Sequence, residues 1–498
     1  MNKKICAFAL VTCARSPSRR TEHASRMRRM LQHLLTLLMC SVALSPSMLF
    51  AYPSVYPTGT TIYKPEKAWN GYTIHPNREG AIVIDMNGNV VKQWKGLDGG
   101  SGTGPYRILP GGFVMGSRGP RGAPHQEAIA LVQLDWDGKV IWKFDKADEV
   151  KDPGKETIWM ARQHHDYQRE GNPVGYYVPG MNPSVNKGNT LILAHKNLRN
   201  PKITDKLLVD DVIYDVTWDG KIVWEWLFSE HFDELGFSEE AKNTLYRHPD
   251  WNDQRAGDWL HTNSMSNVGP NKWYDAGDQR FHPDNIIWSS RNANIIGIID
   301  KKSGKIVWRV GPDYTATPEL RALGQIIGQH YPHMIPKGLP GEGNILVFDN
   351  GGWAGYGAPN PISVTGFRNA QRDYSRVVEF DPATLKIVWE YSAAAAGYPT
   401  PTQNYRFYSG NISSAQRLPN RSTLITEGRT GRIIEVTRDL EIVWEYVSPF
   451  FSSPNPRLKP DNSIYRAYRV PYEWVPQLKK PVEKAVIPPD NSQFRVSP

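Results

Sequence analysis

Cysteine is almost absent from this sequence. The 498 residues contain 3 Cys, at positions 6, 13 and 40. The chain beyond residue 51 therefore has none, which excludes a disulfide, a thiolate nucleophile and a cysteine-ligated metal there. It also lacks a run of about 18 apolar residues, so no membrane-spanning helix is expected beyond that point. A GxxxxGK[ST] phosphate loop is missing as well, which argues against transfer from a nucleotide donor.

The chain after residue 51 carries little net charge. The full chain carries 59 Lys and Arg against 50 Asp and Glu, a formal charge of +9. Residues 1–51 hold eight of these basic residues and one acid, which leaves 51 against 49 for the rest. The basic excess therefore belongs to the N-terminus, and no nucleic-acid partner is expected.

Residues 1–51 are expected to be a signal peptide or an uncleaved N-terminal anchor. Basic residues precede an apolar run that begins at Leu31, and Ala51 stands before Tyr52-Pro53. This order is typical of an export signal. We expect a periplasmic or secreted protein that meets a membrane only through an uncleaved leader. The sequence leaves the oligomeric state open.

A phrase of two short strands ending in tryptophan occurs six times after the leader. The copies end at Trp94, Trp142, Trp224, Trp308, Trp389 and Trp444. Their alternating β-branched residues and tight Asn-Gly or Asp-Gly turns indicate β-hairpins. A second strand–turn–strand phrase precedes most copies, so a typical repeat supplies four strands, as in the blade of a propeller.

These repeats predict an all-β fold, a six-bladed β-propeller with four-stranded blades over residues 52–475. A Pro-rich tail follows at 476–498. Uneven repeat spacing places long loop insertions, such as 227–257 and 351–373, on one face, where insertions usually surround a site. Strands from both termini are expected to close the ring. A pair of β-sandwiches is the alternative fold.

Aligning the repeats with one another predicts a site in the central channel. A step of six residues back from the turn reaches His165, His261 and His330. The end of the next strand, with the residues beside it, adds Arg118, His195, Arg291, Asn350 and Arg429, and His333 follows His330 on its strand. Such a basic pocket suits an anionic ligand, because arginine recognises sulfate, phosphate or carboxylate through paired hydrogen bonds. Histidine can act there as a base or nucleophile.

Other interpretations of these residues stay open. Polar side chains in a propeller channel can simply bridge neighbouring blades, and three histidines can bind zinc. We expect no metal and no organic cofactor. Trp259, Trp288 and Trp353 can stack on an aryl ring or pack between blades. Four further histidines are expected in surface loops, namely His75, His231, His248 and His282.

Four phrases of the sequence resemble the arylsulfotransferase family. They are DWLHTNSM (258–265), IIGQHYPHMIPKG (326–338), GNILVFDNGG (343–352) and RLPNRSTLITEGRTGRIIEVT (417–437). The resemblance extends over roughly residues 65–475. It implies a periplasmic six-bladed propeller that moves a sulfuryl group from a phenolic sulfate ester to a phenol through a sulfated histidine, without a cofactor.

By position, the resemblance makes His261 and His330 the active-site histidines. Two family positions differ here: no arginine follows FDNG until Arg368, and the segment 431–434 reads Gly-Arg-Ile-Ile without a histidine. The alternatives are a non-catalytic propeller that binds an anionic aromatic ligand and, more distantly, a quinoprotein-like dehydrogenase, which the SGKIVW and DGKIVW phrases resemble.

Overall fold

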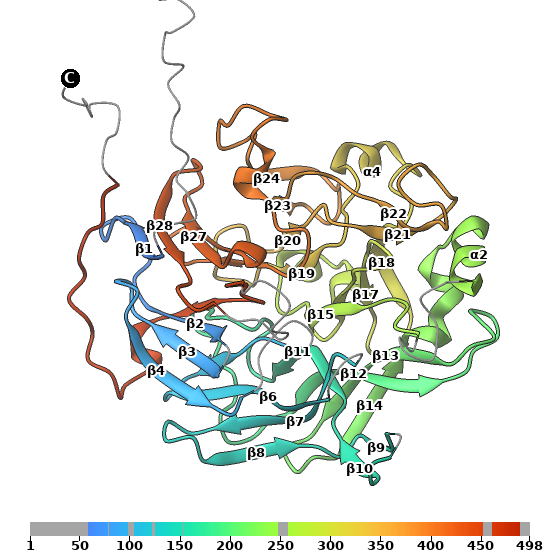
Figure 1. The fold of residues 1–498 in the computed structure, drawn as a ribbon, viewed down its shortest axis with the longest axis horizontal. Helices are drawn as coiled ribbons and strands as arrows, with labels where there is room; N and C mark the ends of the chain where they lie inside the picture. The colour runs from blue at the N-terminus through green and yellow to red at the C-terminus, as the bar shows by residue number, and fades with distance from the viewer. Residues whose placement is uncertain are drawn as a thin grey trace, which may run out of the picture. The chain divides into compact units, whose positions relative to one another are not determined.

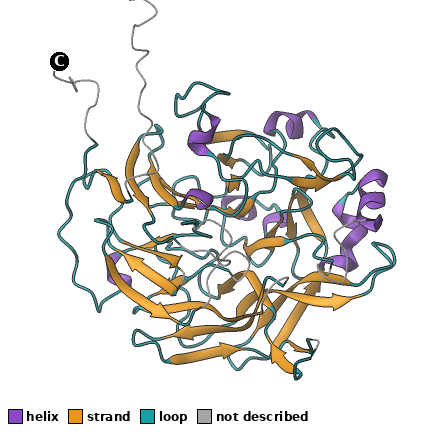
Figure 2. Ribbon diagram, viewed as in Figure 1, coloured by secondary structure: helices purple, strands orange, loops and turns teal. Residues whose placement is uncertain are grey.

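The computed structural model describes residues 58–488 apart from 78, 98–103, 122–124, 153, 248–256 and 452–460. The predicted leader and its cysteines lie outside the described residues. What is described is mostly β-strand with a few short helices (Figure 2). None of the described helices is long and apolar enough to cross a bilayer.

Antiparallel sheets surround a common centre in a propeller-like arrangement (Figure 1). The all-β, propeller-like prediction is therefore confirmed. Two of the sheets have four strands and consecutive pairing. Their strands are β15 (Thr262–Asn267), β16 (Ile286–Ser290), β17 (Ile295–Ile299), β18 (Ile306–Val310), and β19 (His330–Met334), β20 (Ile345–Asp349), β23 (Arg376–Phe380), β24 (Ile387–Ser392).

Two further sheets join strands from opposite ends of the chain. One contains β29 (Tyr468–Val470), β2 (Tyr72–Asn77), β3 (Gly80–Ile84) and β4 (Val90–Lys95). The other contains β25 (Ser414–Arg417), β26 (Thr423–Glu427), β27 (Arg432–Val436), β28 (Ile442–Val447) and β1 (Gly59–Tyr63). Tyr72 pairs with Val470 and Gly59 with Val447, so both ends contribute to closure, as predicted.

The largest sheet has eight strands. They are β5 (Arg107–Leu109), β6 (Phe113–Arg121), β7 (Glu127–Leu134), β8 (Val140–Phe144), β11 (Gln163–Arg169), β12 (Thr190–Leu198), β13 (Leu208–Val216) and β14 (Ile222–Leu227). A single residue pair, Gln163 with Ala128, joins the first four strands to the last four. The sheets therefore do not divide as six separate four-stranded units.

Six buried indole N–H groups connect each hairpin to the turn of the next repeat. The donors are Trp94, Trp142, Trp226, Trp308, Trp389 and Trp444, and the last donates to the carbonyl of Met86 in the first repeat. Tryptophan ends the hairpins because its ring packs between sheets while its N–H finds a carbonyl. In the third repeat Trp226, rather than the predicted Trp224, makes this bond.

The helices and two small sheets lie in the connections. These elements are η1 (Phe228–Leu235), α2 (Glu239–Arg247), α3 (Lys272–Asp275), η2 (Gln279–Phe281), α4 (Pro318–Leu323), η3 (Asn404–Phe407), η4 (Gly428–Thr430), η5 (Tyr472–Trp474), β9 (Asp148–Val150), β10 (Ile158–Met160), β21 (Ala354–Tyr356) and β22 (Phe367–Ala370). The two predicted insertions meet, since Thr244 of α2 donates to the carbonyl of Gly357 at 2.8 Å. Figure 1 shows α2 beside β21 and β22.

Several aromatic and imidazole side chains lie in the core. Trp259 and Trp288 are fully buried among apolar residues, so they pack between elements. His75 belongs to β2 and is also fully buried, so its prediction as a surface-loop residue was wrong. The alternation of β2 turns this side chain inward, where Nδ1 lies 2.9 Å from the carbonyl of Pro76.

Candidate active site

Four histidine rings form a contiguous group near the start of the innermost strands β11 and β15. The rings of His164 and His195 stack with centroids 3.7 Å apart, and those of His165 and His261 meet edge to face at 4.6 Å. His164 and His165 join the two pairs through Nδ1 atoms 2.8 Å apart. A shift of register between β11 and β12 interrupts the normal alternation here, so consecutive histidines both reach the group.

The backbone corrects the repeat alignment. Positive φ angles occur at two places near the start of the innermost strands, first at Arg162, His261, Gly328 and Ile412, and again at His165 and Tyr331. The N–H of His195 donates to the carbonyl of Arg162 and that of Arg291 to the carbonyl of His261, so His261 matches Arg162, whereas Tyr331, and not His330, matches His165. His330 corresponds instead to His164, and each of them follows a glutamine. The alignment missed this because the β19–β20 register shifts within the stretch.

His261 carries an acid partner that the alignment did not single out. Its Nδ1 lies 2.5 Å from Oδ2 of Asp258, and its backbone N–H donates to Oδ1 of the same residue. Burial raises the pKa of Asp258, but His261 outweighs this effect and holds that pKa well below its usual range. The carboxylate fixes the proton on Nδ1 and leaves the Nε2 lone pair of a partly exposed ring free.

Both ring nitrogens of His330 have hydrogen-bond partners. Its Nδ1 lies 2.7 Å from Oδ1 of Asn350, and its Nε2 accepts the N–H of Ile412 at 3.2 Å. Asn350 donates in turn to backbone carbonyls, which fixes its orientation. Burial, followed by the charge of Arg291, lowers the pKa of His330 well below its ordinary value. This imidazole is therefore neutral at neutral pH.

Arg291 is a buried cation next to His261. Its backbone N–H donates to the carbonyl of His261 at 3.3 Å. Its guanidinium lies 5.5 Å from the ring of Trp353, and Arg368 approaches the same ring at 5.9 Å. Burial, and then the charge of Arg368, lower the pKa of Arg291 to about 10. Among the described residues, neither arginine has a carboxylate within 4.0 Å, so together they form an anion site.

The hairpin of β21 and β22 and the residue before it supply Arg368 and Trp353. Trp353, which the sequence already offered as a stacking candidate, precedes β21 and is 38% exposed, whereas Arg368 belongs to β22. The sequence contained Arg368 without indicating where it lies, because only the fold of the hairpin returns it to Arg291. Arg368 is the first arginine after FDNG, although it does not stand directly after that phrase.

Three predicted site residues are engaged elsewhere. Arg118 donates to the carbonyl of Gly96. Arg429 lies 3.8 Å from Asp461 with about half of its side chain exposed. His333 is fully buried, with Nε2 2.8 Å from the hydroxyl of Tyr176 and a pKa that burial lowers to about 3. The predicted His165, His195, His261, His330, Arg291 and Asn350 do lie in or beside the histidine group.

A second basic cluster lies further along the innermost strands. Asp166 accepts from Arg107 at 2.6 Å and from Arg466 at 3.0 Å, and all three side chains are buried. Arg466 comes just before β29, the C-terminal strand that pairs with β2. The carboxylate balances part of the cationic charge, so this cluster is an internal ion-pair network.

The segment 431–434 contributes to another ion-pair network. Arg432 lies 3.0 Å from Oε2 of Glu427 and 2.5 Å from Oε1 of Glu445. Gly431 takes a positive φ of 63°, which suits glycine at the turn between β26 and β27. The segment therefore holds a structural arginine at its second position and, at its last position, where the resemblance implies a histidine, the fully buried Ile434.

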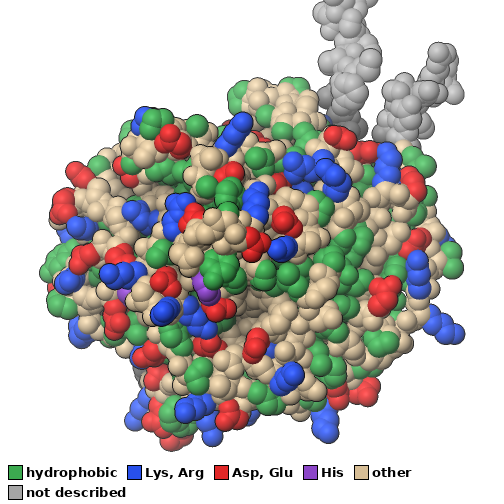
Figure 3. All heavy atoms as spheres, turned by 180° about the vertical axis from the view of Figure 1, so that it is seen from behind, with side chains coloured by type: hydrophobic (Ala, Val, Ile, Leu, Met, Phe, Trp, Pro, Cys, Tyr) green, Lys and Arg blue, Asp and Glu red, His purple; other side chains and the backbone are tan. Residues whose placement is uncertain are grey.

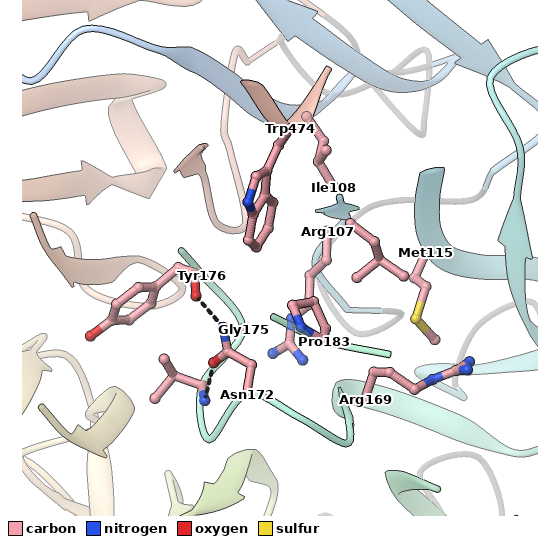
Figure 4. A pocket seen from close by; sticks show the side chains of 11 residues that line it. Arg107, Ile108, Met115, Arg169, Asn172, Gly175, Tyr176, Pro183 and Trp474 are labelled. Atoms are coloured by element: carbon pink, nitrogen blue, oxygen red, sulfur yellow. Dashed lines mark hydrogen bonds between the residues drawn. The ribbon is translucent and has the colours of Figure 1, made fainter. Parts of the chain in front are cut away.

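In the described part of the chain, the face drawn in Figure 3 and the two cavities nearest to β11 show no second group of histidines. Acidic and basic side chains are interspersed over the face in Figure 3. One cavity of ≈ 290 Å³ is lined by Arg107, Arg169, Asn172, Tyr176 and Trp474 among others (Figure 4). Another, of ≈ 1350 Å³, is lined by Gln168, Glu170, Asn267 and Lys301 among others. Both lie towards the far ends of β11 and β15 from His165.

Comparisons with known proteins identify one family. The family model described as arylsulfotransferase (ASST) matches residues 183–447, which is more than half of the chain. A search of curated proteins finds no match.

Solved structures resemble the chain only weakly. A protein of unknown function from Bacteroides caccae covers 81% of this chain over 99% of its own length, with 10% identity and a TM-score of 0.41. Virginiamycin B lyase from Staphylococcus aureus, solved with quinupristin, covers 72% over 73%, with 14% identity and a TM-score of 0.31. The Cps50 (Swd1) β-propeller domain of Myceliophteria thermophila covers 79% over 88%, with 10% identity and a TM-score of 0.37. Scores this low carry no argument about activity.

Proposed function

Because the chain belongs to the arylsulfotransferase family, we propose that it transfers a sulfuryl group from a phenolic sulfate ester to a phenol through His261. The observation that carries this proposal is the pairing of His261 with Asp258 at 2.5 Å, next to Arg291. The guanidinium of Arg291 donates to Oδ1 of Asn292 at 3.0 Å and has no carboxylate within 4.0 Å among the described residues. A carboxylate-oriented imidazole with a free Nε2 is an activated nucleophile. Buried arginines without acids suit a sulfate group.

The proposed reaction has two balanced steps. In the first, the Nε2 lone pair of His261 attacks the sulfur, a nitrogen–sulfur bond forms, and the bond from sulfur to the donor phenolate oxygen breaks. In the second, the acceptor phenol oxygen attacks the same sulfur and His261 leaves. The proton lost by the acceptor phenol equals the one gained by the departing phenolate, so the transfer balances overall. Solvent is the assigned carrier, because both ring nitrogens of His330 already have hydrogen-bond partners.

Arg291 and Arg368 stabilise the negative charge on the sulfuryl oxygens in this proposal. A preorganised donor in a site shielded from water contributes about 3 kcal/mol to such a transition state. The exposed ring of Trp353 offers a stacking surface for the aryl group. We assign Arg118, Arg429 and His333 no role, because their partners lie outside this group.

We also infer six blades and export. The single pair that joins the halves of the eight-stranded sheet supports its division into two blades, and the six indole contacts support a closed ring of six. Export rests on residues 1–51 alone. A reporter enzyme that is active only outside the cytoplasm tests it, since failure of residues 1–51 to activate the fused reporter contradicts export.

The assay for the transferase uses 4-nitrophenyl sulfate with phenol and follows nitrophenolate release. We expect His261→Ala to lower kcat/KM by about 10³-fold or more. His231→Ala is the matched control: His231 contacts Glu234 three residues away at 2.8 Å, and its exposure of 19% is close to the 18% of His261. Donor alone should add the mass of one SO₃ group to the wild-type protein and none to His261→Ala.

Two outcomes contradict the proposal. Unchanged turnover in His261→Ala removes this residue from the mechanism. Binding of aryl sulfates without turnover by the wild-type chain favours the alternative of a non-catalytic receptor for anionic aromatic ligands.

A further inference from the structure

A second group of ligating atoms lies beside the proposed nucleophile and is not used by it. His164, His195 and Asp211 come from the adjacent strands β11, β12 and β13. Their Nε2, Nε2 and Oδ1 atoms all lie within 4.8 Å of one another. Oδ1 of Asp211 is 3.2 Å from Nε2 of His164 and 3.6 Å from Nε2 of His195. All three side chains are buried.

The orientation of His195 is fixed from outside this group. Its Nδ1 lies 2.9 Å from Oε2 of Glu127, which Arg121 and Arg162 hold at 2.5 and 3.2 Å. A carboxylate flanked by two guanidiniums stays ionised, so it accepts the Nδ1 proton and leaves Nε2 as a lone pair. A carboxylate behind a histidine is the usual support of a metal-bound imidazole.

Two atoms at the centre of the group lack a hydrogen bond among the described residues. They are Nε2 of His164 and Oδ1 of Asp211, and both are fully enclosed. The other oxygen of Asp211 accepts the N–H of Thr262 at 2.7 Å. Leaving such buried atoms unpaired costs about 1–3 kcal/mol each. In addition, Asp211 has only these imidazoles within ion-pair distance in the described part of the chain.

We propose that His164, His195 and Asp211 bind one divalent transition-metal ion. A cation shared by the three atoms satisfies both unpaired groups and the buried carboxylate. Two imidazoles with one carboxylate favour zinc or a neighbouring first-row metal over calcium or magnesium, which prefer oxygen. Ligands about 2.0–2.1 Å from a tetrahedral ion lie about 3.3 Å apart, close to the two measured distances.

This set differs from the zinc alternative considered from the sequence, which used histidines of three repeats. The cross-strand pairing of His195 with Asp211 brings this carboxylate to the rings of His164 and His195. The proposal is independent of sulfuryl transfer, because it concerns metal binding and not turnover.

The experiment uses the untagged chain and zinc alone. The protein is stripped with a chelator and then titrated with Zn²⁺ against a chromophoric competitor. We expect one ion per chain. Asp211→Asn and His195→Gln should each weaken binding at least 10-fold, and Glu127→Gln should weaken it about 10- to 100-fold. His75→Gln, which removes a buried imidazole elsewhere, is the matched control and should bind like the wild type.

X-ray absorption of the zinc-loaded wild type tests the site without any variant, so it does not depend on whether the variants fold. Nitrogen and oxygen ligation with imidazole scattering supports the site. Sulfur ligation points to the leader cysteines and overturns it, as does the absence of stoichiometric zinc. Equal affinity in folded Asp211→Asn also overturns the proposal.

Discussion

Two arginine pairs in this protein have opposite electrostatic surroundings. Arg107 and Arg466 share the carboxylate of Asp166, at 2.6 and 3.0 Å. Arg291 and Arg368 flank the ring of Trp353, and no carboxylate of a described residue lies within 4.0 Å of either. The protein supplies an anion to the first pair and none to the second.

The pKa values follow this difference. Burial lowers the pKa of both Arg291 and Arg466, but Tyr465 and then Asp166 raise that of Arg466 well above its ordinary value. For Arg291 the next cause is Arg368, which lowers the pKa further. A buried cation without a counter-ion destabilises the fold and stabilises a bound anion. The first pair is therefore structural, and the second suits a ligand.

Asp166→Asn should have the largest effect on stability, because it removes the carboxylate that Arg107 and Arg466 share. It leaves two buried guanidiniums without a carboxylate, so the free energy of unfolding should fall by about 3–5 kcal/mol. Urea denaturation measures this change. Asp233→Asn breaks an exposed pair with Lys202 and should stay within about 0.5 kcal/mol of the wild type. Equal losses in the two variants contradict the structural role of Asp166.

Arg291→Met removes one cation from the arginine pair that has no carboxylate partner. Turnover of 4-nitrophenyl sulfate should fall about 10²- to 10³-fold, because a donor to the sulfuryl oxygens is lost. Stability should be unchanged or higher, since an unpaired buried cation has been removed. A large loss of stability together with activity argues that Arg291 is structural. Arg118→Met is the control, because this arginine donates to the carbonyl of Gly96 and lies outside the histidine group.

The sequence predicted the strands well because their signals are local. Tryptophan at the end of each hairpin reflects a bond to the next turn, and only Trp224 was displaced, by two residues, to Trp226. The Asp258–His261 pair was readable too, since its members stand three residues apart in one phrase. The apolar strand LVDDVIYDV contains three acids, Asp211 among them, which is a signal for buried polar groups that the repeat alignment left unused.

The remaining features depend on geometry that a repeat alignment does not contain. The one-residue error at His330 arose from a shift of register, which changes the face of every following residue. Arg368 reaches Arg291 only because the hairpin of β21 and β22 folds back. Arg466 joins Asp166 because β29 closes the first sheet, a pairing of residues far apart in the chain.

Stabilisation by a bound ligand should also distinguish the two arginine pairs. We expect its effect to be smaller than those of Asp166→Asn and Arg291→Met. Benzenesulfonate, whose carbon–sulfur bond is not transferable, should stabilise the wild type by about 2.7 kcal/mol at 100 times its Kd. The gain should disappear in Arg291→Met. In Trp353→Leu it should shrink for benzenesulfonate and persist for inorganic sulfate. Thermal unfolding at constant ionic strength measures it. A gain that survives in Arg291→Met places the anion elsewhere.

His75 shows a third way to bury a basic group, which is to keep it neutral, and its effect should be the smallest. Burial lowers its pKa to about 4, and its ring lies near that of Tyr446 and the carbonyl of Pro76. Above pH ~6.5 both folded and unfolded states are neutral here. As pH falls from there to about 4, only the unfolded state gains the proton, so stability declines by at most about 1.4 kcal/mol per pH unit. In His75→Gln the slope of unfolding free energy against pH should be shallower by that amount, whereas identical slopes would mean that the imidazole is charged when folded.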